Sequence, residues 1–172
     1  YISDESFSLI DTVANGVYPV WLDSKTKIGF HSPNNFYYYI IDAVTKDTLN
    51  SYDLTSYGTF VRGRYSEVLS KFIFDVNHHG FESLGIMDSE GSIQIMSLDY
   101  PIYNPVSSGT DDWIYYLKNA DSTFNVCRMK LNGAVEEQIT NSSEYGYGNF
   151  SVSFDGEYIV VPKKNSEHHF IV

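Results

Sequence analysis

A repeat of about 43 residues constrains the fold of this sequence more than any other feature. Four short segments end in a hydroxyl residue, and their last residues are Thr12, Thr55, Ser97 and Thr140, separated by 43, 42 and 43 positions. A second marker is a short apolar run whose first residues are Ile28, Phe72, Ile114 and Ile159, separated by 44, 42 and 45 positions. Two independent markers with one period indicate that a single supersecondary unit is repeated along the chain.

The content of each repeat is typical of a β-sheet. Aromatic residues make up 16% of the chain, led by 15 Tyr and 11 Phe, and such side chains suit half-buried strands. No segment has the apolar spacing that an amphipathic helix needs, and turn sequences such as Asn132-Gly133 separate the short alternating runs. A repeat of this length therefore predicts an all-β fold of β-propeller blades, each of four antiparallel strands, with about four blades in the chain.

The predicted strands are labelled a to d in each blade, from the central channel outward. In the first blade they cover residues 18–22, 27–31, 36–42 and 49–55, and in the second 61–65, 71–76, 82–87 and 93–98. In the third they cover 104–108, 113–118, 124–131 and 136–140, and the fourth has only 149–153, 158–162 and 168–172. We expect one domain over 1–172, with blade boundaries near 13–55, 56–98, 99–140 and 141–172 and with 1–12 as an outer strand.

Two arrangements of these blades are compatible with the repeat. In a closed four-bladed ring, residues 7–12 complete the fourth blade as its missing outer strand. In a larger ring, the chain is a run of blades whose open ends pair with further blades or with other chains. The absence of an initial Met and the cramped geometry of a four-bladed ring favour the second arrangement slightly.

The sequence motifs of the repeats resemble those of the TolB-like propellers, which are related to WD repeats. Blade four has Ser-Phe-Asp-Gly at 153–156 and Ile-Val-Val at 159–161, similar to the Ser-Pro-Asp-Gly turn and Ile-Ala-Phe strand of that family. Blade three has Asn-Gly at 132–133 followed by a Gln-Ile-Thr ending at 138–140. The resemblance implies an extracytoplasmic location (periplasmic, cell surface or secreted) and binding of a protein or peptide at one face of the ring. These motifs set turns and packing, so they identify no contact residue.

Charge and cysteine content restrict the partners. The formal net charge is −11, and the basic clusters are short, so the sequence lacks the basic stripe of a nucleic-acid binder and disfavours anionic membranes. The longest apolar stretches are too short to span a bilayer, and we expect no membrane insertion. Cys127 is the single cysteine and is expected to be a buried, inert thiol. We expect neither a cofactor nor a bound metal.

Two enzyme classes that use propellers have recognisable catalytic signatures. Serine peptidases of the related families need a Gly-x-Ser-x-Gly elbow on a separate hydrolase domain, and this sequence has no such pentapeptide. Glycosidases need carboxylates at the channel mouth, whereas Asp23, Asp111 and Asp112 fall in a–b turns on the face away from the usual active side. The sequence predicts a non-catalytic protein. The alternative is the gating or substrate-binding propeller of a serine peptidase, or a divergent glycoside hydrolase.

Polar and aromatic loops gather at the face formed by the b–c loops and the d–a connections. Tyrosine gives rigid, amphipathic contact area, and loop histidines and asparagines add hydrogen bonds. The candidate binding residues on this face are Asn34, Asn35, Tyr57, His78, His79, Tyr103, Tyr145, Tyr147 and His168. Adjacent histidines on a strand point to opposite faces, so we interpret them as solvated loop residues and not as metal ligands. We therefore predict a protein- or peptide-binding propeller scaffold of the cell envelope or extracellular space.

Overall fold

The computed structural model describes residues 2–3, 9–11, 16–22, 26–34, 36–96, 98–120, 123–141, 149–162 and 168–171. Within these ranges every regular element is a β-strand, and all the strand pairs given for them are antiparallel. The chain folds as two compact units, Tyr1–Thr59 and Phe60–Val172. The all-β prediction of four-stranded antiparallel blades is confirmed.

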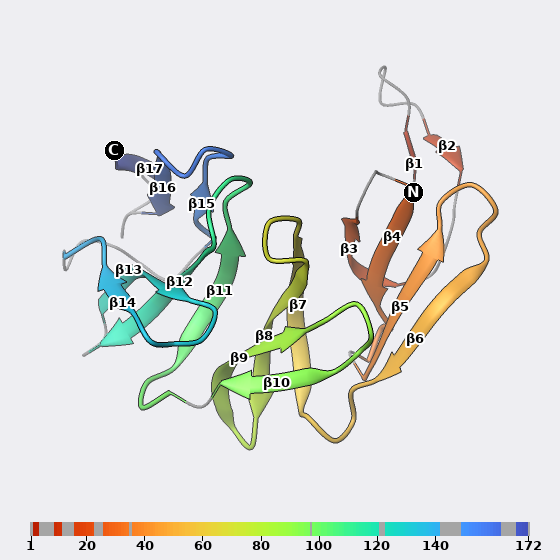
Figure 1. Ribbon diagram of the computed structural model, residues 1–172, viewed down its shortest axis with the longest axis horizontal. Coiled ribbons are helices and arrows are strands. Elements are labelled where there is room, and N and C mark those ends of the chain that lie inside the picture. Colours follow the sequence, from red (N-terminus) through yellow and green to blue (C-terminus); the bar gives the residue numbers. More distant parts are fainter. Residues whose placement is uncertain are drawn as a thin grey trace. The chain divides into compact units, whose positions relative to one another are not determined.

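The first unit contains one four-stranded blade (Figure 1). Its strands, in spatial order, are β3 (Val17–Trp21), β4 (Lys27–His31), β5 (Tyr37–Asp42) and β6 (Thr48–Asp53). Two short strands, β1 (Ile2–Ser3) and β2 (Leu9–Asp11), pair with each other in a separate sheet. The completion of the fourth blade by residues 7–12 stays a prediction.

The second unit contains two four-stranded sheets and one three-stranded sheet (Figure 1). Blade two consists of β7 (Thr59–Ser66), β8 (Lys71–His78), β9 (Phe81–Met87) and β10 (Ile93–Met96). Blade three consists of β11 (Ile102–Ser107), β12 (Trp113–Ala120), β13 (Thr123–Lys130) and β14 (Glu136–Gln138). The last sheet consists of β15 (Ser151–Val152), β16 (Ile159–Pro162) and β17 (His168–Ile171). Strands adjacent in the chain are adjacent in each sheet, as a propeller blade requires.

The core of the second unit lies between successive blades. Strand β12 alternates its side chains between two buried clusters. Ile114 and Tyr116 belong to a cluster shared with β8 and β9 of blade two. Tyr115 and Leu117 belong to another, which includes Ile159 from the last sheet. A strand covered on both faces needs apolar residues at consecutive positions, which explains why the b strands lack the usual alternation. Each such side chain contributes about 1.5–3 kcal/mol through burial.

The Ser-x-Asx turn of the family motif is built in the same way at two places. In blade four, Ser153 Oγ donates to Asp155 Oδ1 at 2.5 Å and accepts the Tyr158 N–H at 2.9 Å. In the first unit, Ser32 Oγ donates to Asn34 Oδ1 at the same distance of 2.5 Å. The first turn joins strands a and b, and the second joins b and c. The motif therefore specifies a hairpin without specifying its place in the blade.

Thr140, one of the hydroxyl residues that mark the repeat, closes the outer edge of blade three. Its side chain is buried, its Oγ1 accepts the Val126 N–H at 2.9 Å, and its hydroxyl donates to Asn125 Oδ1 at 3.1 Å. Strand β14 ends at Gln138, so these bonds continue the attachment to β13 beyond the regular ladder.

Replacing Thr140 by Val is expected to lower the free energy of unfolding by about 1–2 kcal/mol, because it leaves the buried amide of Val126 without this acceptor. Urea denaturation measures the loss. Thr55→Val is the matched control, because Thr55 is exposed and its hydroxyl donates to the nearby Asp53 carboxylate at 2.7 Å. Its expected cost is within about 0.5 kcal/mol. Equal losses for the two variants would contradict a structural role specific to Thr140.

Candidate functional site

One arginine joins the innermost strands of three successive blades in the second unit. Arg62 lies on β7, Asn104 on β11, and Asn149 two residues before β15. Arg62 Nη1 donates to Asn104 Oδ1 at 2.6 Å and to Asn149 Oδ1 at 2.5 Å. The three positions are 42 and 45 residues apart, the same separations as in the apolar marker of the b strands. They therefore occupy one equivalent position in three repeats, and we call them the Arg62 junction.

A buried carboxyl group lies beside the Arg62 junction. Asp75 on β8 is 4% exposed, and its Oδ2 accepts the backbone N–H of Asn104 at 2.9 Å. This bond depends on a bulge in β11, where Asn104 has a left-handed φ of 52°. Asparagine tolerates that conformation better than most residues, and the bulge turns its N–H out of the β-ladder. Blade two and blade three are thus connected through Asp75.

The environment of Asp75 moves its ionisation toward neutral pH. Burial is the main cause that raises the pKa of Asp75 to about 7, and the charge of Glu82 acts in the same direction. The Asn104 N–H, Arg62 and Arg64 act in the opposite direction on that pKa. The second oxygen, Oδ1, is buried and has no hydrogen-bond partner among the described residues. A neutral acid and an ionised carboxylate are therefore both populated near pH 7 at this position.

The first unit has a different residue at the position equivalent to Asp75. His31 lies 44 residues earlier, the spacing of the repeat, and is buried at the end of β4. Its ring packs edge-on against Tyr38, with centroids 4.9 Å apart. Burial lowers the pKa of His31 to about 4, so this imidazole is neutral at physiological pH. Within the described residues no group of three or more His, Cys, Asp or Glu is close enough to hold a metal ion.

The sequence-predicted binding residues have different local roles. In the first unit, Asn34 caps the b–c turn through Ser32, and the Tyr57 N–H bonds the Leu54 carbonyl in a turn. In the second unit, His78 and His79 adjoin at the β8–β9 turn, with ring centroids 4.2 Å apart.

Of the remaining predicted residues, Tyr103 packs against Phe124 at 5.8 Å between ring centroids, and His168 begins β17. Asn35, Tyr145 and Tyr147 lie outside the described residues. The binding role of the whole set stays a prediction.

Sequence reasoning missed Arg62, Asp75 and Asn149. In the sequence, Arg62 and Arg64 form one of the short basic clusters, and that cluster alone predicts no site. The repeat period is a signal that could have found two of them. Arg62, Asn104 and Asn149 occupy equivalent positions in successive repeats, although their residue types differ. A carboxylate inside the apolar run of β8 was a second visible signal, since a buried charge needs a reason.

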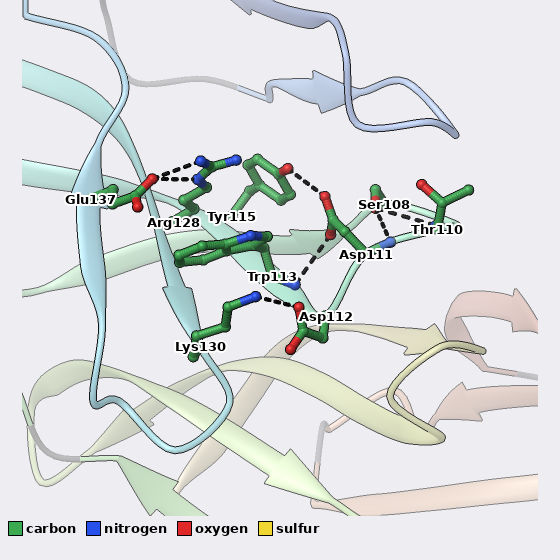
Figure 2. Close-up of polar contacts among 9 residues, drawn as sticks. All are labelled: Ser108, Thr110, Asp111, Asp112, Trp113, Tyr115, Arg128, Lys130 and Glu137. Carbon is green, nitrogen blue, oxygen red and sulfur yellow. Dashed lines mark hydrogen bonds and ion pairs between the residues drawn. The ribbon is translucent and has the colours of Figure 1, made fainter.

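The two carboxylates of the a–b turn in blade three, Asp111 and Asp112, form hydrogen bonds and an ion pair within the blade (Figure 2). Asp111 accepts the Trp113 N–H at 3.1 Å and the Tyr115 hydroxyl at 2.7 Å. Asp112 forms an ion pair with Lys130, which lowers the pKa of the Asp112 carboxyl. These contacts order the turn and the strands on either side of it. Asp23, the third acid considered for glycosidase chemistry, lies outside the described residues.

Trp113 lies between two cations on the same surface (Figure 2). The Arg128 guanidinium is 4.4 Å from its ring centroid, and the Lys130 ammonium is 3.9 Å away. Glu137 binds Arg128 at 2.6 Å and fixes its side chain. The two cations cover the faces of the Trp113 ring. The charges of Arg128, Lys130 and Glu137 therefore have a structural role here.

A concave region lies at the other ends of the same inner strands, away from the Arg62 junction. It has a volume of about 380 Å³ and is lined by the ends of β7 and β11 and by residues of the β15 turn, among them Tyr65, Glu67, Ser108 and Phe154. Phe154 is 74% exposed and packs over Gly109, where a Cβ would come within 2.0 Å of its ring.

Cys127 is a free cysteine. The thiol is buried in β13, and burial raises the pKa of Cys127 to about 11, so it is protonated at neutral pH. The expected buried thiol is confirmed. Among the described residues there is no helix of the length and hydropathy that crossing a bilayer requires.

Comparisons with known proteins bear on the fold. No family model matches the chain, and no curated protein matches it significantly. Among solved structures, TolB from Acinetobacter baumannii is 17% identical, with a TM-score of 0.74 over 98% of this chain and 44% of that one. The putative TolB from Agrobacterium tumefaciens is 14% identical, with a TM-score of 0.58 over 74% and 51%. The tricorn protease is 11% identical, with a TM-score of 0.63 over 91% and 16%.

The sheets and the junction between their inner strands define a protein built of β-propeller blades. The solved structures identify the fold more narrowly as a TolB-like β-propeller, which confirms the resemblance seen in the sequence. The chain spans about half, or less, of the length of the TolB chains that it matches.

Proposed function

We propose that the chain is a non-catalytic propeller scaffold that binds a protein or peptide at the end of the inner strands where the Arg62 junction lies. The junction carries this proposal. It gathers an arginine and two asparagines from three blades toward the ends at which the inner strands begin, and Asn149 there is exposed. Amide and guanidinium groups fixed by their neighbours are suited to binding peptide carbonyl and carboxylate groups.

We also propose an extracytoplasmic location, in the periplasm, at the cell surface or outside the cell. The TolB-like fold and the motifs at 153–156 and 159–161 support it through the family resemblance. The absence of a nucleic-acid-binding stripe in a chain of net charge −11 supports a protein or peptide as the partner.

The likeness to the tricorn protease favours a second candidate. In this alternative the chain is the gating or substrate-binding propeller of a larger serine peptidase. The glycosidase alternative has no comparable support, because Asp111 and Asp112 both hold the a–b turn of blade three.

Selection of randomised peptides on the purified chain tests the proposal. We expect enriched peptides whose binding, measured by fluorescence polarisation, weakens about tenfold in Asn149→Ala, a loss of about 1.4 kcal/mol. Phe154→Ala, at the other end of the inner strands, is the control and should leave the affinity unchanged.

Three outcomes would contradict the proposal. Failure to enrich any peptide would refute peptide binding. Loss of binding in Phe154→Ala alone would place the site at the wrong end of the inner strands. Cleavage of the bound peptides, detected by mass spectrometry and abolished by a single Ser or carboxylate substitution, would refute the non-catalytic role.

A further inference from the structure

Two guanidinium groups stand on the innermost strand of blade two. Arg62 and Arg64 are two residues apart on β7, so their side chains leave the same face of the strand. Both are close enough to Asp75 to lower its pKa through their charge. In a chain with 11 basic and 22 acidic residues, two arginines on one strand face form a local concentration of positive charge.

These arginines differ from the other cations that the structure describes in the second unit. Ion pairs with acidic side chains hold Lys71, Lys118, Arg128 and Lys130. Neither Arg62 nor Arg64 forms an ion pair with a carboxylate among the residues that the structure describes, and Arg64 is exposed. Their charge is therefore not neutralised by a direct partner in this part of the chain.

Among the described residues, the Arg62 junction uses only one nitrogen of the Arg62 guanidinium. Nη1 uses both of its hydrogens on the oxygens of Asn104 and Asn149. Within the described part of the chain, Nε and Nη2 make no hydrogen bond, and these two nitrogens form the side edge that binds a carboxylate through two parallel bonds. Since the asparagines hold the guanidinium in place, little rotamer freedom remains to be lost on binding.

The bond to Arg62 also fixes the orientation of the Asn149 side chain. Because the Asn149 oxygen accepts from Arg62, its amide nitrogen points elsewhere and is a donor on an exposed side chain. A donor beside a carboxylate-binding edge matches a peptide, in which carbonyl groups adjoin the acid. The planar guanidinium of Arg62 fits a carboxylate better than the single ammonium of a lysine would.

We propose that Arg62 and Arg64 form a carboxylate-binding subsite for the peptide partner, with the Nε and Nη2 edge of Arg62 as its main contact. This inference rests on the proposed function. The shared chemistry is a carboxylate, whether it belongs to an Asp or Glu side chain or to the C-terminus of the peptide.

The experiment uses a peptide selected on the whole chain, prepared in matched forms. One form has a C-terminal amide, another has each acidic side chain replaced by its amide, and the parent retains every carboxylate. Affinities are measured for the wild type, Arg62→Gln, Arg62→Lys, Arg64→Gln and the control Lys71→Gln, which removes a positive charge from outside the subsite. Circular dichroism and thermal unfolding check the fold, and Arg64→Gln leaves the Arg62 junction intact.

We expect Arg62→Gln to weaken binding of the parent peptide about tenfold or more, as for other charge-assisted bonds. Arg62→Lys should be intermediate because an ammonium cannot supply the fork, and Lys71→Gln should change the affinity less than about twofold. Neutralising the bound carboxylate should remove the difference between the wild type and Arg62→Gln, and the form in which this occurs identifies the source of the acid. If all neutral forms bind the wild type as tightly as the parent does, the subsite is wrong while the proposed function stands. If no peptide is enriched, the proposed function itself fails.

Discussion

Replacing Asp75 by Asn is expected to stabilise the protein at neutral and higher pH and to leave its stability nearly unchanged near pH 4. The reason is the raised pKa of Asp75, which reaches about 7 because the carboxyl is buried beside β11. An Asp in the unfolded chain has a pKa of about 3.9. Between these two values the folded protein keeps a proton that the unfolded chain has released.

The sign of the pH dependence follows from this proton difference. The stabilisation associated with protonated Asp75 is fully present below about pH 4 and is lost as the pH rises through about 7. The total change is on the order of 4 kcal/mol, since each pKa unit corresponds to about 1.4 kcal/mol. Asn keeps the neutral shape of the protonated acid at every pH, so its oxygen still accepts the Asn104 N–H.

Urea denaturation of the wild type and Asp75→Asn across this pH range measures the effect. The matched control is Asp88→Asn. Hydrogen bonds from the backbone of Ser92 and Glu90 lower the pKa of Asp88, so its contribution is present above pH 4 and is lost as the pH falls. The two variants should therefore differ from the wild type in opposite directions. A carboxyl resonance of Asp75 that titrates near pH 4 by NMR would refute the prediction.

Much of the fold was predictable because a blade is a local structure. Strand β4 coincides with the predicted strand 27–31, since its apolar run and its flanking turns are read directly from neighbouring residues. The inner strand of blade four is shorter than the predicted 149–153 and covers only Ser151–Val152. Asn149 instead bonds Arg62, and Phe150 is buried in the cluster shared with blade three.

The candidate site was harder to predict because it depends on how blades pack. The equivalent position holds Arg in one blade and Asn in two others, so a search for repeated motifs passes over it. The link from Asp75 to Asn104 also depends on a bulge with positive φ, which spacing alone does not reveal. By contrast, the predicted residues Asn34 and Tyr57 were chosen for residue type, and the structure gives both of them a local role in turns.

Gly29→Ala is expected to destabilise the first unit by about 3 kcal/mol, at the upper end of the usual cost of overpacking. Gly29 lies in the middle of β4 and pairs with Ile40 on β5. Tyr38, two residues before Ile40 on the same strand face, is fully buried, and its hydroxyl lies over Gly29. A Cβ on Gly29 would come within 2.0 Å of Tyr38 Oη and within 2.7 Å of its Cζ. The Tyr38 ring has little room to move because it packs against His31.

The double variant Gly29→Ala with Tyr38→Phe separates this clash from a general effect of a methyl group in the strand. An alanine in a strand interior normally stabilises by about 0.5–1 kcal/mol relative to glycine, so the sign of the change is itself informative. Removing the hydroxyl takes away the nearest clashing atom, and the double variant should recover part of the loss relative to Gly29→Ala alone. Tyr38→Phe by itself is the control, and thermal and urea unfolding of all four proteins complete the double-mutant cycle. A Gly29→Ala protein as stable as the wild type, or a cycle with no coupling between the two sites, would show that Tyr38 does not occupy the space above Gly29.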